Sequence, residues 1–122
     1  LSQHLNAALQ RYDYAEIIKW ICDDTDRRED VYPTIIPGYD RSPRAGRKAQ
    51  IYTGNTPQLF ARHAADAISR VTHKPPEHRI IFLKSWNEWG EGNYIEPDRL
   101  HGAAFLAALK EALYHHSADI SL

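Results

Sequence analysis

The chain has 122 residues, of which 43% are hydrophobic and 25% are charged, a composition typical of a folded globular domain. Its 15 basic and 16 acidic residues leave a formal charge of −1, which gives no reason to expect binding to nucleic acid or to an anionic membrane. The longest run of large aliphatic and aromatic residues, Ile80 to Leu83, is far shorter than the roughly 20 residues that cross a bilayer, so no transmembrane helix is expected.

Both the start of the chain and its cysteine content bear on where the protein works. Leu1 is not a methionine, and no charged segment followed by an apolar core begins the chain, so no signal peptide is recognisable and the natural start is expected upstream. Cys22 is the only cysteine of the chain, which excludes a disulfide within it. A lone cysteine gives no disulfide framework from which to infer the compartment, so a cytoplasmic protein is the default expectation.

The first half of the chain predicts a helix, a strand and a long loop. Apolar residues at helical spacing indicate a helix over residues 13–23. Residues 31–36 combine β-branched and aromatic side chains and are followed by Pro37-Gly38, which predicts a buried strand. Residues 37–55 contain prolines, glycines and four basic residues, and indicate a loop much longer than the usual connection of about 4–6 residues.

The second half repeats this alternation. Thr56-Pro57 predicts a helix start, because the hydroxyl can cap the first turn and the missing proline N–H costs nothing there; Lys74-Pro75-Pro76 should end this helix. Residues 79–85 predict a second strand, buried on both faces because four apolar residues are consecutive. Residues 86–102 are expected to form a loop, and residues 103–114 the last helix.

The order helix, strand, helix, strand, helix predicts a βαβ unit with parallel strands, because the crossover is longer than a dozen residues. Two parallel strands form an incomplete sheet. A (β/α)8 TIM barrel takes about 250 residues, so we expect residues 1–122 to be the C-terminal third of one barrel domain. The remaining strands would come from the full-length chain or from an oligomer.

The clearest candidate site follows the second strand. Ligands bind at the carboxyl ends of parallel strands in α/β folds. Glu88 and Glu91 follow such an end, and Trp86 and Trp89 beside them offer flat apolar surfaces on which a sugar ring can stack. Asn87 can donate hydrogen bonds to sugar hydroxyls and accept them. This pattern predicts a carbohydrate-active site with a catalytic pair of carboxylates.

The spacing of the two glutamates leaves the mechanism open. Retaining glycosidases hold their two carboxyl groups about 5–5.5 Å apart and inverting ones about 6.5–9.5 Å apart. Residues three apart are about 5–6 Å apart on a helical turn and roughly 10 Å apart on an extended strand. Ordinary loop glutamates would give the same spacing. Two other functions also remain: a non-catalytic carbohydrate-binding or assembly module, and a truncated fragment without activity.

The loop after the first strand supplies further candidates. Tyr39, Asp40 and Arg44 can bind sugar hydroxyls or a phosphate, whereas a turn aspartate and a solvated arginine are the simpler alternative. A basic cluster of this loop could contact a nucleotide-sugar or lipid pyrophosphate, but a solvated loop is expected because no glycine-rich cradle accompanies it. The cluster consists of Arg41, Arg44, Arg47 and Lys48.

The remaining motif lies in the last loop, and two kinds of site are not expected. Glu96-Pro97-Asp98 is expected to order its loop and to begin the last helix. The seven histidines show no His-Glu-x-x-His spacing and there are no paired cysteines, so no metal site is expected. No sequence pattern calls for a cofactor.

Two segments resemble the signatures of a known family. Residues 81–98, which contain Trp86-Asn87-Glu88-Trp89-Gly90-Glu91-Gly92, resemble the specific signature of the WbsX-like family of polysaccharide-biosynthesis proteins. Residues 32–44 resemble its second signature, except that Tyr39 and then Asp40-Arg41-Ser42 stand where the family has Trp and then Asp-Asn-Thr, which changes the substrate contacts expected there. This bacterial family is usually labelled glycosyltransferase, and it looks like a relative of the endo-α-mannosidase glycoside hydrolases.

The resemblance implies a glycosyltransferase or a retaining glycoside hydrolase that acts on lipopolysaccharide or another surface polysaccharide. It implies a TIM barrel of which this chain is the C-terminal portion. It also makes Glu91 the general acid/base that protonates the leaving oxygen. Glu88 would act as a base on the sugar 2-hydroxyl, whose oxygen then attacks the anomeric carbon. A carbohydrate, either a glycan or a lipid-linked sugar, is the expected partner.

Overall fold

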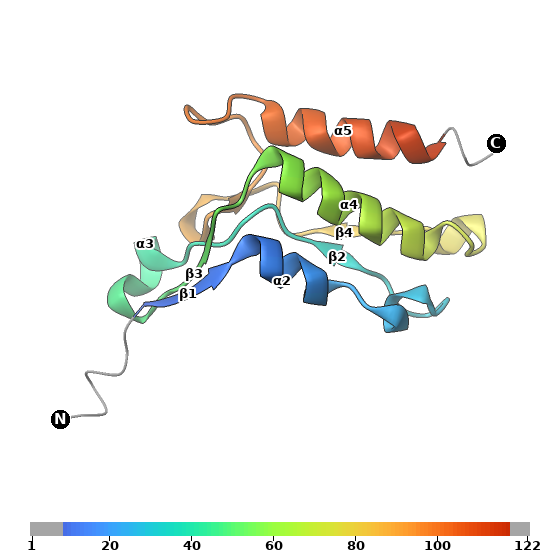
Figure 1. Ribbon diagram of the computed structural model, residues 1–122, viewed down its shortest axis with the longest axis horizontal. Coiled ribbons are helices and arrows are strands. Elements are labelled where there is room, and N and C mark those ends of the chain that lie inside the picture. Colours follow the sequence, from blue (N-terminus) through green and yellow to red (C-terminus); the bar gives the residue numbers. More distant parts are fainter. Residues whose placement is uncertain (1–8, 118–122) are drawn as a thin grey trace.

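Two parallel strands form the centre of the fold. In the computed structural model, which describes residues 9–117, β2 (Thr34–Ile35) pairs in parallel with β4 (Phe82–Leu83) (Figure 1). The Phe82 N–H donates to the Pro33 carbonyl at 2.9 Å, and the Lys84 N–H donates to the Ile35 carbonyl at 2.9 Å. The crossover between them contains a long helix, residues 57–71, so the predicted βαβ unit with parallel strands is confirmed.

Two long helices cover one face of this strand pair. Helix α4 (Pro57–Val71) begins as predicted, with the Thr56 hydroxyl accepting the Leu59 N–H at 3.1 Å. Helix α5 (Ala104–Ser117) packs along α4, and the rings of Phe60 and Phe105 lie 5.7 Å apart between them. None of the helices within residues 9–117 is long and apolar enough to span a membrane. The buried core between helices and strands comprises Cys22, Ile35, Phe60, Ala64, Ala67, Ile68, Ile95, Phe105, Ala108 and Ala112.

The N-terminal part adds a second parallel pair that the sequence did not predict. Strand β1 (Gln10–Asp13) pairs in parallel with β3 (Gln50–Thr53). Helix α2 (Tyr14–Ile21) follows β1 directly, and the Asp13 carboxylate caps it by accepting the Ala15 N–H at 3.2 Å. All four residues of β1 are exposed, so no buried face marked this segment as a strand.

Both segments predicted as loops contain regular structure. Residues 37–55 hold α3 (Ser42–Ala45), a 3₁₀ turn and β3. Residues 86–102 hold β5 (Asn87–Glu88), the 3₁₀ turn Trp89–Glu91 and β6 (Asn93–Tyr94), which runs antiparallel to β5. The prediction of plain loops was therefore wrong. Strands of two residues are too short for hydrophobic periodicity to reveal them.

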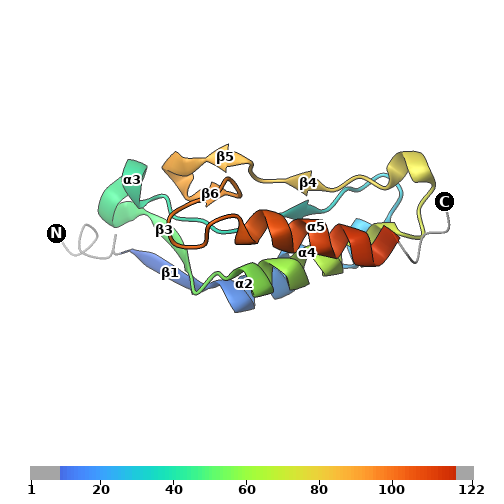
Figure 2. The same cartoon turned by 90° about the horizontal axis from the view of Figure 1, so that it is seen from above.

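Strand β4 is buried on one face only. Leu83 and Ile81 pack against the core, whereas Phe82 is 57% exposed and Ile80 is 42% exposed. Helices α4 and α5 lie on the same side of the strands, and none of the helices described within residues 9–117 lies on the other (Figure 2). The prediction that this strand is covered on both faces is therefore wrong for the described residues. Cover on both faces needs a second layer of structure on the exposed side of the strand.

Three buried polar side chains from the helical part of the chain contact backbone groups at the end of β2. The Tyr14 hydroxyl donates to the Ile36 carbonyl at 2.7 Å, and the Ile36 N–H donates to His63 Nε2 at 3.1 Å. Burial lowers the pKa of His63 from 6.5 to about 4, so the ring is neutral near neutral pH. The Cys22 thiol points at the Thr34 carbonyl, 3.8 Å away, and burial raises its pKa to about 12.

We predict that His63 makes the stability of the fold depend on pH. Its pKa is lower in the folded state than in the unfolded state, so the unfolded chain binds the proton more readily and stability falls as the pH drops from 6.5 towards 4. Denaturant unfolding should show a loss of up to about 3 kcal/mol over this range. His63→Gln, whose amide oxygen can still accept the Ile36 N–H, should remove most of that loss. Equal pH slopes in the two proteins would refute the assignment.

Candidate active site

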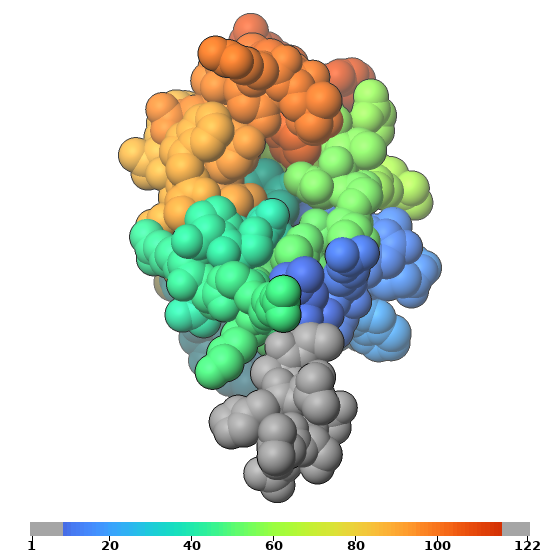
Figure 3. Space-filling model, turned by 90° about the vertical axis from the view of Figure 1, so that its left-hand side faces the viewer, coloured from blue at the N-terminus to red at the C-terminus, as the bar shows by residue number. Residues whose placement is uncertain are grey.

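The loops after β2 and β4 meet at one end of the molecule. The Asp40 N–H donates to the Glu91 carbonyl at 2.7 Å, and α3 packs against the turn Trp89–Glu91. The approach is so close that a Cβ on Gly92, whose φ is +60°, would lie 2.8 Å from the backbone nitrogen of Asp40. Only glycine fits this position without displacing the first loop. Figure 3 shows the two segments, in teal and orange, side by side on this face.

Both predicted catalytic glutamates contact the same arginine. Arg44 reaches Glu88 Oε1 at 2.9 Å and Glu91 Oε1 at 3.4 Å. The 3₁₀ turn directly after Glu88 turns the chain back, so the extended spacing of about 10 Å left open by the sequence does not occur. The side chain of Glu91 is 21% exposed and that of Glu88 is 39% exposed. A guanidinium therefore holds two solvent-accessible carboxylates on one side of the loop.

Gly90 makes room for this arginine. A Cβ at Gly90 would lie 2.8 Å from Arg44 Nε and 3.0 Å from its Nη2. The guanidinium thus lies directly over the backbone between the two glutamates. Any side chain at this position would push Arg44 away from at least one carboxylate.

A buried hydrogen-bond network supports the backbone at Glu88. The Ser85 hydroxyl donates to the Asn93 carbonyl at 2.5 Å, lies 3.0 Å from Asn93 Oδ1, and accepts the Glu88 N–H at 2.9 Å. Asn93 is fully buried, and its Nδ2 has no hydrogen-bond partner among the described residues. Ser85 and Asn93 were not among the predicted site residues, although both flank the glutamate motif as small polar residues.

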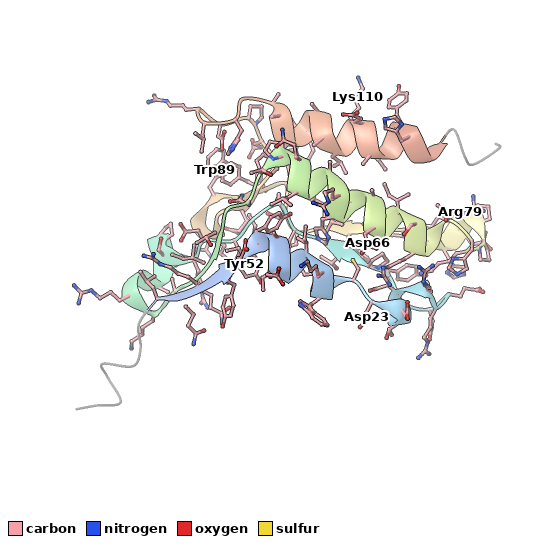
Figure 4. All side chains as sticks on the ribbon, in the orientation of Figure 1. Asp23, Tyr52, Asp66, Arg79, Trp89 and Lys110 are labelled. Atoms are coloured by element: carbon pink, nitrogen blue, oxygen red, sulfur yellow. The ribbon has the colours of Figure 1, made fainter. Side chains whose placement is uncertain are left out.

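The two tryptophans remain accessible beside the glutamates. Trp86 is 53% exposed and Trp89 is 46% exposed. The Trp89 ring stacks on Tyr94 with centroids 3.6 Å apart, and its Nε1 donates to Glu96 at 3.0 Å. Trp89 and Tyr52 lie towards the end of the molecule opposite Arg79 (Figure 4). One face of the Trp89 indole is therefore occupied, and its orientation is fixed.

A cavity of about 340 Å³ lies behind Trp89 and takes its walls from both loops. Asp98 orders its rim by accepting the Tyr94 hydroxyl at 2.8 Å and the His101 N–H at 2.7 Å. Burial would raise the pKa of Asp98, but these hydrogen bonds keep it below its usual value, and burial together with Asp98 raises that of Tyr94 to about 12. Neither glutamate lines the cavity, whose walls are Pro37, Gly38, Asp40, Pro43, Asn55, Trp89, Gly92, Tyr94, Asp98, Leu100, His101 and Phe105.

Comparison with known sequences places this site in a family. The family model described as Glycosyltransferase WbsX matches residues 2–109. The chain belongs to the WbsX glycosyltransferase family. It is 34% identical over 103 residues to the uncharacterized protein WxcX of Xanthomonas campestris pv. campestris strain B100, covering 84% of the chain and 15% of that protein. The WxcX protein of strain ATCC 33913 is 38% identical over 84 residues, which cover 68% of the chain and 12% of that protein.

The chain thus spans about a seventh of the length of these curated relatives or less, since it covers 15% and 12% of them. No solved structure matches it. Membership of the WbsX family agrees with the resemblance seen in residues 32–44 and 81–98, both of which lie within the matched range. A function related to carbohydrates follows from the family.

Of the remaining predicted site residues, Tyr39 and Asp40 make contacts within their own loop, and Asn87 is exposed. The Tyr39 ring packs 5.4 Å from that of Tyr52, and the Asp40 carboxylate accepts the Ser42 N–H at 2.9 Å, the turn role considered as the alternative. Asn87 is exposed beside the glutamates. Within residues 9–117, no three His, Cys, Asp or Glu side chains are grouped to hold a metal ion. The motif 96–98 does order its loop, but α5 begins only at Ala104.

We predict that Ser85→Ala destabilises the loop that carries the glutamates. Without the hydroxyl, the part-buried Glu88 N–H and the Asn93 carbonyl each lose a partner, which should cost about 1–3 kcal/mol. Denaturant unfolding would measure the loss, with the exposed Ser69→Ala as the matched control, although that hydroxyl also donates locally, to the Asp66 carbonyl. A change at Ser85 no larger than that at Ser69 would contradict the proposed network.

Proposed function

We propose that this chain is the C-terminal part of an enzyme that cleaves or transfers glycosyl groups of a cell-surface polysaccharide or lipopolysaccharide. The observation that carries the proposal is the convergence of Glu88 and Glu91 on Arg44 at the end of the parallel strands. Membership of the WbsX glycosyltransferase family supports a carbohydrate substrate. A cytoplasmic location is part of the proposal as its default.

In the proposed mechanism the two carboxyl groups have separate tasks. Glu91 protonates the oxygen of the leaving group, while Glu88 removes the proton of the sugar 2-hydroxyl, whose oxygen attacks the anomeric carbon. In a second step Glu91 removes the proton of the incoming hydroxyl, whose oxygen attacks the anomeric carbon. The bond from that carbon to the 2-oxygen breaks, the 2-oxygen regains its proton from Glu88, and the configuration is retained. Water as the acceptor gives a hydrolase, and a sugar hydroxyl gives a transferase.

The cavity behind Trp89 is the proposed place for a sugar ring next to the reacting one. Its volume of about 340 Å³ falls at the lower end of the range usual for small-molecule sites, roughly 300–1,000 Å³. An aromatic wall with a few polar groups at the rim is the composition expected for binding a sugar.

We predict that Glu91→Gln and Glu88→Gln each lower kcat of the full-length protein by at least about 100-fold, because each removes a proton-transfer group. Turnover of a cell-surface polysaccharide oligomer would be followed by chromatography. Glu77→Gln, an exposed glutamate at the other end of the fold, should leave kcat unchanged. Near wild-type turnover in Glu91→Gln would end the proposal.

A non-catalytic carbohydrate-binding module is the second candidate, favoured by the accessible Trp86 and by a cavity that excludes both glutamates. Such a module would bind glycan without turnover. Binding that survives the double change Glu88→Gln and Glu91→Gln, in a protein whose wild type shows no turnover, would select this function.

We also propose that the chain completes a (β/α)8 barrel together with the rest of the full-length protein. The support is the exposed face formed by Phe82 of β4 and by Ile80 just before the strand, as the interior of a barrel would require. A barrel needs such side chains in its central layers.

This proposal predicts that Phe82→Ser destabilises the full-length protein by about 3–5 kcal/mol, as for a buried aromatic residue. Trp20→Ser is the control, because Trp20 is 79% exposed on α2. Thermal or denaturant unfolding measures both. If Phe82→Ser costs no more than the control, this face of the strand is not covered.

A further inference from the structure

Residues 41–48 form a basic segment with unpaired charge. Arg41, Arg47 and Lys48 are exposed, and no ion pair or hydrogen bond of their side chains occurs in the part of the chain that the structure describes. Arg44 is the one member that contacts acidic groups, namely the two glutamates.

The basic segment lies against the candidate active site. It comprises α3 and the 3₁₀ turn Gly46–Lys48, and α3 packs on the turn Trp89–Glu91. In Figure 3 this segment, in teal, borders the orange loop that carries the glutamates. A group bound over the glutamates is therefore within the range of these cations, since unscreened charge acts over about 8–10 Å at ordinary salt concentrations.

The basic segment itself carries only positive charge, although the whole chain does not. Residues 41–48 hold four cations and no carboxylate, whereas the chain as a whole has a formal charge of −1. Asp40 lies directly before the segment, and its carboxylate accepts the Ser42 N–H at 2.9 Å. No carboxylate among the described residues forms an ion pair with Arg41, Arg47 or Lys48.

We propose that the basic segment binds an anionic group of the glycan substrate, a phosphate or a carboxylate, next to the glutamate pair. This inference rests on the proposed function and adds the charge of its substrate. A neutral sugar needs only hydrogen bonds, which the tryptophans, Asn87 and the cavity already offer. Cations at the rim that form no ion pair attract anions and raise their local concentration, and arginine forks fit phosphate and carboxylate oxygens in pairs.

The test measures anion binding to the full-length protein without turnover. Inorganic pyrophosphate and D-glucuronate are titrated separately at low salt, and binding is followed by calorimetry or NMR. At least one should bind, more weakly as salt is added. The double variant Arg47→Gln/Lys48→Gln should bind about fivefold more weakly, because two exposed charge contacts are lost. The matched control Arg62→Gln/Lys110→Gln removes the same charge from α4 and α5, where Lys110 lies away from the site (Figure 4), and should bind as wild type does.

Each outcome decides the proposal. Binding of pyrophosphate alone supports a phosphate-bearing substrate, and binding of glucuronate alone supports a uronic acid. The proposal is overturned if neither anion binds, or if the control loses as much affinity as the Arg47/Lys48 variant. The glutamate mechanism is judged separately, because Glu91→Gln should lose turnover yet retain anion binding. If Glu91→Gln loses turnover but the wild-type protein binds neither anion, this inference is refuted and the glutamate mechanism is not.

Discussion

The contact on which the candidate site depends is the backbone hydrogen bond from Asp40 to Glu91. It ties a loop that follows β2 to a loop that follows β4, two segments separated by a whole helix in the sequence. The absence of a side chain at Gly92 lets the two backbones come this close. Through this contact the strand pairing fixes where α3 lies, and α3 in turn carries Arg44 to the glutamates.

Much of the fold could be predicted because its signals are local. The hydroxyl of Thr56 and the ring of Pro57 fix the start of α4 whatever surrounds them, and apolar spacing marks each long helix. The strands β1 and β5 escaped prediction for a physical reason. Gln10–Asp13 is exposed throughout and Asn87–Glu88 is only two residues long, so their pairing comes from partners distant in sequence and not from a pattern of their own.

The candidate site was predictable in its residues and not in its contacts. The carboxylate pair stood out through its tryptophans, but its geometry depends on whether the chain turns after Glu88, which spacing does not determine. Arg44 was expected to meet a ligand and instead meets both carboxylates. Ser85 and Asn93 carry no sequence signal that separates a buried network from an ordinary turn, because the difference lies in their burial and their partners.

The burial of Cys22 allows its reactivity to report how often the packing between helices and strands separates. A thiol that is buried between α2 and β2, with a pKa of about 12, reacts with alkylating reagents only when this packing separates. The rate of its modification under native conditions therefore measures how often the layer of helices lifts from the strands. Glycan that binds at the far end of the strands would slow this reaction only if the two ends of the sheet move as one unit.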